Sequence, residues 1–135
     1  MKYPFYILLV LASCTAKKKA DPLLGKWEYE KIELYSGEPV NLQDSIFNLL
    51  HTQQTGLTFY FEKNNIFKVT QKKPDNTETP MAEQPYELPE DKKTLRLKNR
   101  GQEDDNFPII SMSDSILKIN IFYSKVGYLV FRKKE

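Results

Sequence analysis

The chain has 135 residues, of which 20 are Lys or Arg and 18 are Asp or Glu, so its formal net charge is +2. This length suits a single domain with one hydrophobic core, and the balanced charge, without basic residues interleaved among aromatics, excludes a nucleic-acid-binding surface. Its single cysteine excludes an internal disulfide.

The start of the chain has the pattern of a secretory leader. Met1-Lys2 is a short positive start, and Phe5 to Leu11 is an apolar run too short to span a bilayer. The run ends in Leu11-Ala12-Ser13-Cys14, which resembles the bacterial lipobox. The resemblance implies cleavage before Cys14 and a lipid on its thiol; the alternative is an ordinary signal peptide that contains a cysteine. We predict a lipoprotein signal peptide at 1–13 and a lipidated tether at 14–22.

The residues after Cys14 bear on where the protein is anchored. Thr15 stands where an aspartate would mark a lipoprotein for the inner membrane in typical Gram-negative sorting, so the lipobox resemblance implies the outer membrane. The basic run Lys17–Lys19 either contacts anionic headgroups, at about 1 kcal/mol per residue, or is a solvated tether. Acidic residues at this place mark surface-exposed lipoproteins in some bacteria, so the basic run favours the periplasmic face.

The first predicted strand follows the tether and holds Trp27, the only tryptophan. Trp27 and Tyr29 share one face of a strand, whereas Ile32 and Leu34 share the other. The change of phase predicts a β-bulge near Glu30-Lys31, which would let one long strand serve two sides of a curled sheet. This pattern favours a small antiparallel barrel.

A short helix is predicted from Leu42 to His51, with Asn41 as its N-cap. Because so short a helix is not stable alone, we expect it to lie across one end of the barrel. His51 is the only histidine, and its place at the helix C-terminus indicates an interaction with the helix dipole or simple exposure rather than catalysis. The apolar residues of the helix fall on one face: Leu42, Ile46, Leu49 and Leu50.

The next two strands are predicted at 56–63 and 66–72, and their pairing decides the length of the loop between them. A two-residue turn at Asn64-Asn65 would place aromatic residues opposite polar ones. A loop of residues 63–65 instead places apolar residues opposite one another, and it lets Asn65 take the left-handed conformation of a bulged turn. The resulting pairs are Phe61 with Phe67 and Phe59 with Val69.

The second half of the chain alternates short strands with turns. Residues 73–85 contain three prolines and are predicted to be the longest loop, at the rim of the barrel. Glu103-Asp104-Asp105 lacks EF-hand spacing and a converging ligand set, so we predict a solvated turn and no metal site. The remaining strands are predicted at 86–88, 94–98, 107–112, 116–123 and 126–133.

Eight strands joined in sequence order predict an all-β fold, an up-and-down antiparallel barrel with one short helix after the first strand. The chain resembles the lipocalin-like lipoproteins common in Bacteroidetes. The resemblance implies a lipocalin-like barrel over residues 23–135, and it implies that Arg132 of the last strand packs over Trp27 to close the barrel. The segments that carry it are Gly25-Lys26-Trp27, Leu57-Thr58-Phe59, Tyr86-Glu87-Leu88, Leu95-Arg96-Leu97 and Phe131-Arg132.

Two functions remain open on these grounds. In the first, the membrane-anchored barrel binds a small apolar or amphipathic ligand; in the second, the barrel is filled and its rim loops dock an envelope protein, because eight-stranded barrels allow either arrangement. One histidine, no Gly-rich phosphate loop and no metal-ligand spacing predict that the protein is not an enzyme and needs no cofactor. The residues expected to face a ligand are Tyr29, Phe59, Phe61, Phe67 and Val69.

Overall fold

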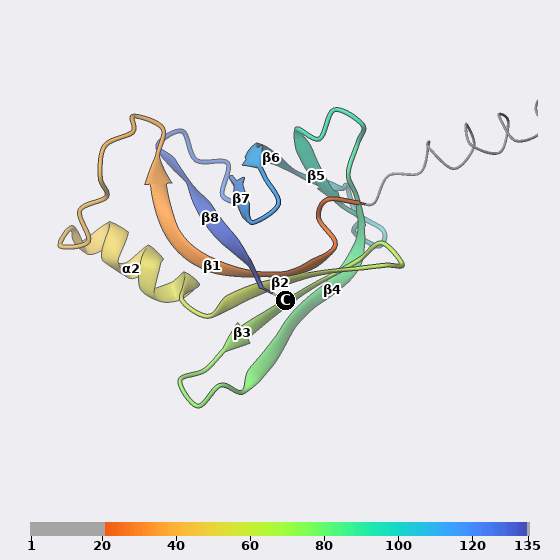
Figure 1. Cartoon of the computed structure of the whole chain (residues 1–135), viewed down its shortest axis with the longest axis horizontal. Helices are drawn as coiled ribbons and strands as arrows, with labels where there is room; N and C mark the ends of the chain where they lie inside the picture. The colour runs from red at the N-terminus through yellow and green to blue at the C-terminus, as the bar shows by residue number, and fades with distance from the viewer. Residues whose placement is uncertain (1–20, 135) are drawn as a thin grey trace, which may run out of the picture.

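The computed structural model describes residues 21–134, which form a closed barrel of eight antiparallel strands in sequence order (Figure 1). The last strand pairs with the first and closes the barrel, so the predicted up-and-down barrel with a helix after the first strand is confirmed. The elements are β1 (Gly25–Leu34), α2 (Ser45–Gln54), β2 (Leu57–Glu62), β3 (Ile66–Lys72), β4 (Glu78–Glu87), β5 (Thr94–Leu97), β6 (Asp105–Met112), β7 (Ile116–Ile119) and β8 (Gly127–Lys134).

β1 contains the predicted bulge, but the bulge has a different effect from the one expected. The register with β8 shifts between Tyr29 and Lys31. Tyr29 lies opposite Phe131 and Ile32 lies opposite Leu129, and alternate residues of a strand share a face. The bulge therefore keeps the apolar residues of the whole strand on the inside of the barrel, instead of directing them to two sides.

The β2–β3 hairpin has the predicted register. Phe61 lies opposite Phe67, Phe59 lies opposite Val69, and the loop consists of residues 63–65. Asn65 adopts a φ of 59°, in the left-handed region that this turn needs. A slip by one residue would move every inward side chain to the solvent face, so the burial of the aromatic residues selects the three-residue loop.

The long loop predicted at 73–85 is wrong, because most of this segment is β4. Only residues 73–77 form the turn, and β4 then pairs with β3 as far as Pro85. Along most of this length β4 has no partner on its other side, since it pairs with β5 only at its end. An edge strand tolerates Pro80 and Pro85, because an N–H that points away from the sheet needs no partner. In Figure 1 the β3–β4 hairpin projects away from the barrel.

α2 begins at Ser45, and its N-cap is Asp44 rather than the predicted Asn41. The Asp44 carboxylate accepts hydrogen bonds from the backbone N–H groups of Ile46 and Phe47, at 2.9 and 3.4 Å. These are two of the N–H groups that the first turn of a helix leaves without a partner, so the capping carboxylate fixes where the helix starts.

The two ends of the barrel differ. At the end where β1 begins, here called the closed end, Leu23 and Trp27 are fully buried, and the indole N–H donates to the Leu23 carbonyl oxygen at 2.8 Å. The Tyr86 hydroxyl donates to the Asp21 carboxylate at 2.6 Å. Residues 21–24 thus seal the closed end, while α2 lies by the open end, where β1 finishes (Figure 1).

Aromatic rings fill the closed half of the interior. Phe59 stacks on Phe131 with ring centroids 4.2 Å apart, and Phe67 lies 4.9 Å from Phe59. Phe61 lies 5.1 Å from Phe67 and 5.0 Å from Tyr86. Stacked, tilted and edge-to-face pairs at these distances are favourable beyond the area they bury, so this half of the barrel is packed by its own side chains.

Candidate functional site

Beyond the aromatic core, toward the open end, the barrel is hollow. A pocket of about 290 Å³, here called the barrel pocket, lies just below the usual range for small-molecule sites, about 300–1,000 Å³. Gln54, Gln84 and Asp105 are its polar residues. Most of its wall is apolar and includes Leu57, Phe59, Phe67, Val69, Leu97 and Phe107.

One side of the barrel pocket is the seam between β4 and β5. These strands pair at only two positions, Tyr86 and Glu87, whereas β3 and β4 pair at seven. Farther toward the open end the gap is bridged by side chains. Gln84 Nε2 donates to Asn99 Oδ1 at 2.8 Å, and Asn99 Nδ2 donates to Asp105 Oδ2 at 3.0 Å. Two amides and a carboxylate therefore replace a backbone ladder in this part of the wall.

Asp105 is the pocket residue that the sequence interpretation missed. The solvated turn predicted at 103–105 is wrong for Asp105, which is the first residue of β6 and lies opposite the buried Leu97. Residues opposite one another share a face, so the Asp105 side chain points inward. The alternation of side chains along β6 identifies it, because Asp105, Phe107 and Ile109 lie two residues apart and therefore share one face of the strand.

The structure separates the five residues predicted to face a ligand. Phe59, Phe67 and Val69 line the barrel pocket. Phe61 faces inward but is packed among the aromatic rings of the closed half, and Tyr29 faces inward and contacts α2. Ligand contact by the three pocket residues stays a prediction.

Tyr29 connects the barrel interior to α2. Its hydroxyl lies 2.8 Å from His51 Nδ1, and the two ring centroids are 5.5 Å apart. Burial raises the pKa of Tyr29 to about 12, so the hydroxyl keeps its proton at neutral pH and forms a neutral hydrogen bond with the imidazole. Since α2 has no buried side chain, we infer that this hydrogen bond holds the helix at the open end.

Replacing Tyr29 by phenylalanine should loosen α2 while leaving the ring in place. We expect faster amide hydrogen exchange in α2 and a loss of about 0.5–1.5 kcal/mol in the free energy of unfolding, the usual contribution of one hydrogen bond. Tyr60→Phe is the matched control, because its hydroxyl donates to Glu78 on the β3–β4 hairpin. Unchanged exchange in α2 of Tyr29→Phe would contradict this role.

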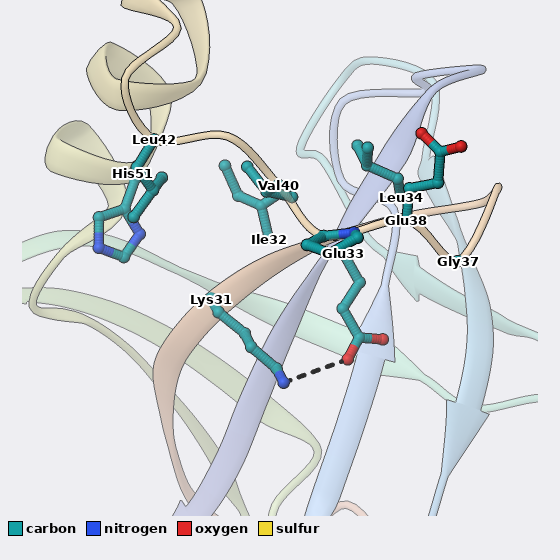
Figure 2. Close-up of a pocket in the computed structure, with 10 residues that line it drawn as sticks. Lys31, Ile32, Glu33, Leu34, Gly37, Glu38, Val40, Leu42 and His51 are labelled. Atoms are coloured by element: carbon teal, nitrogen blue, oxygen red, sulfur yellow. Dashed lines mark ion pairs between the residues drawn. The ribbon is translucent and has the colours of Figure 1, made fainter.

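Other pockets lie outside the aromatic core, and two of them border β1 or β8. One of about 310 Å³ lies between α2 and β8 and is lined by Phe47, Leu50 and Leu129 among others. The other, of about 450 Å³, lies between β1 and the loop that leads to α2 (Figure 2). Figure 2 shows an ion pair in its wall, Lys31 Nζ to Glu33 Oε2 at 3.4 Å. These charges make this pocket a poorer site for an apolar ligand than the barrel pocket.

Lys133, not the predicted Arg132, covers Trp27 at the closed end. Lys133 lies opposite Trp27, and its Nζ is 5.2 Å from the centroid of the indole ring. Arg132 points outward, where its Nε and one terminal nitrogen donate to the Glu30 carboxylate at 3.1 and 3.3 Å. Successive side chains point to opposite faces of a strand, so a difference of one position exchanges an inward cation for an outward one.

Cys14 and the leader lie outside the described residues. Within residues 21–134, no helix is long and apolar enough to cross a membrane. In the same part of the chain, His, Cys, Asp and Glu form no group of three or more placed to hold a metal ion.

Comparison with known proteins bears on the fold. No family model matches the sequence, and no curated protein matches it. The chain is similar to the crystal structure of a lipocalin-like protein from Bacteroides uniformis ATCC 8492, with a TM-score of 0.53 and 18% sequence identity over 84% of this chain and 100% of that one. Together with the strand order and the helix after β1, this likeness shows that the barrel has a lipocalin-like fold.

Proposed function

We propose that the protein is a membrane-anchored binding module that holds a small apolar or amphipathic molecule in the barrel pocket. The observation that carries the proposal is the hollow of about 290 Å³ above a packed aromatic core. A concave, mainly apolar space with a few convergent polar groups is the usual form of a small-molecule site. The size of the pocket suits one alkyl chain or a small ring system better than a lipid with several chains. No catalytic step is part of the proposal.

Binding of the neutral fluorescent probe N-phenyl-1-naphthylamine tests the proposal. The purified chain carrying Cys14→Ser, which has no lipid of its own, should bind the probe saturably. Val69→Trp fills the pocket from its wall and should weaken binding at least about tenfold, because the ligand loses its apolar contacts. Met81→Trp, at a side chain 60% exposed on the β3–β4 hairpin, is the control and should bind as the unsubstituted protein does. A well-folded sample without saturable binding would contradict the proposal.

We propose further that a lipid on Cys14 anchors the protein to the outer membrane, on its periplasmic face. The support is the segment Leu11-Ala12-Ser13-Cys14, followed by Thr15 and a basic run. Two or three acyl chains anchor a protein firmly where one chain is marginal.

Metabolic labelling tests the lipid anchor. An alkynyl fatty acid fed to cells should label the protein and leave Cys14→Ser unlabelled, and the substituted protein should leave the membrane fraction. Equal labelling of the two proteins would show that Cys14 is not the acylated residue.

A role in docking an envelope protein is the second candidate, and exposed apolar side chains favour it. Ile46 and Leu49 of α2 are 67% and 58% exposed, and Phe122 and Val126 of the β7–β8 loop are 49% and 58% exposed. Large exposed apolar side chains of this kind are typical of interaction surfaces where they form a contiguous patch. Ile46→Glu with Leu49→Glu should abolish a cross-link to a partner in cells, whereas Met81→Glu should leave the cross-link intact.

A further inference from the structure

The wall of the barrel pocket is mainly apolar but contains one charged side chain. Of the residues that line it, Asp105 alone is charged. No lysine, arginine or histidine in the described part of the chain forms an ion pair with it. The neighbouring Asp104 differs, because its carboxylate pairs with Lys98 at 3.1 Å and it does not line the pocket.

The Asp105 carboxylate is held in place from one side. Asn99 Nδ2 donates to Asp105 Oδ2 at 3.0 Å and to the Glu103 carbonyl oxygen at 2.9 Å, while Asn99 Oδ1 accepts from Gln84. The Asn99 side chain is therefore fully engaged and fixes the orientation of the carboxylate. Within residues 21–134 no hydrogen bond reaches Asp105 Oδ1, so this oxygen can accept one from a guest in the pocket.

We infer that Asp105 is a headgroup-binding residue, and that the barrel pocket selects amphiphiles with an ammonium headgroup over those with a carboxylate. The inference rests on the proposed function and adds the charge of the ligand to it. The apolar tail would lie along Phe59, Phe67 and Val69, with the ammonium group at Asp105. A fatty carboxylate in the same pose would bring two like charges together in a half-buried site, where water screens them only in part.

Three ligands with the same twelve-carbon chain test this inference by displacing N-phenyl-1-naphthylamine: dodecylammonium, dodecanol and dodecanoate, each below its micelle concentration at neutral pH. We expect the affinity to fall in that order, with about a tenfold or greater difference between the two charged ligands, since hydrogen bonds to charged groups are stronger than neutral ones. Dodecanol reports the apolar contact alone.

Asp105→Asn should reduce the preference for dodecylammonium over dodecanoate by about tenfold, because the amide keeps the shape of the carboxylate and removes its charge. Asp104→Asn is the matched control, since it changes the net charge equally at a residue outside the pocket, and its preference should stay that of the unsubstituted protein. Salt gives a readout that needs no variant: added NaCl should weaken dodecylammonium binding and leave dodecanol binding unchanged.

The outcomes separate the inference from the proposed function. If the probe itself does not bind, the binding function is contradicted and the inference fails with it; if the probe binds but none of the three ligands displaces it, the binding function stands and the inference fails. If all three bind with equal affinity, or if Asp104→Asn and Asp105→Asn change the preference alike, the binding function stands and the role of Asp105 is overturned.

Discussion

Replacing Trp27 by alanine is expected to lower the free energy of unfolding by about 3–5 kcal/mol, the range for truncation of a large buried aromatic side chain. Trp27 is fully buried, and its indole N–H donates to the Leu23 carbonyl oxygen at 2.8 Å. The substitution removes the ring, leaves a cavity at the closed end and deprives that carbonyl oxygen of its partner. Because domains of this size are stable by about 5–15 kcal/mol, the loss is a large part of the total.

Urea unfolding of a small set of variants measures this effect and tests how the closed end is built. Lys133→Met removes a cation over the indole ring and should cost about 0.5–2 kcal/mol. Arg132→Met removes an exposed ion pair with Glu30 and should cost at most about 1 kcal/mol. A larger loss for Arg132→Met than for Lys133→Met would contradict the placement of Lys133 over Trp27, and an unchanged stability of Trp27→Ala would contradict its place in the core.

The parts of the fold that could be predicted from the sequence are those in which burial and local geometry agree. In the β2–β3 hairpin, only the loop of residues 63–65 places Phe61 and Phe59 opposite apolar partners, and Asn65 can adopt the φ that this loop needs. The phase change in β1 likewise located the bulge next to Tyr29. Both inferences need only neighbouring residues and the alternation of side chains in a strand.

β4 could not be predicted because the meaning of its prolines depends on a distant strand. Pro80 and Pro85 are strong signals for a loop when the sequence is considered alone. In the barrel they lie on a strand that has one partner along most of its length, where a proline is tolerated. Whether β4 has a second partner is decided by how few residues β5 contributes, which is information from another part of the chain.

The candidate site could be predicted from the sequence only in part, again because some of it depends on how distant strands pair. The inward residues of the β2–β3 hairpin follow from its register, and three of them line the barrel pocket. The inward cation over Trp27 depends on the register between β1 and β8, which pairs the two ends of the barrel and differs by one position from the register that the resemblance implied. The sequence predicted a turn at Asp105 because this residue follows two other acidic residues. Asp105 lies two residues before Phe107, however, so both side chains point to the inside of the barrel.

Gly56→Ala is expected to be the most damaging of the small substitutions, at about 2–5 kcal/mol, because two costs add. Gly56 has a φ of +88°, where a side chain costs about 1–2 kcal/mol. An added methyl group would also overlap the backbone carbonyl oxygen of Lys72, whose N–H donates to the Gly56 carbonyl oxygen at 2.8 Å. Forced overpacking of this kind costs about 1–3 kcal/mol.

Gly37→Ala separates these two costs. Gly37 has a φ of +82°, but a methyl group there would meet no atom within 4 Å, so only the conformational cost applies. Gly56 also precedes Leu57 of the barrel pocket, and a displaced β2 would move that wall. We therefore expect Gly56→Ala, and not Gly37→Ala, to weaken binding of N-phenyl-1-naphthylamine as well as to lower the urea midpoint. Equal losses of stability in the two variants would show that the approach of Lys72 to Gly56 is not what makes the glycine necessary.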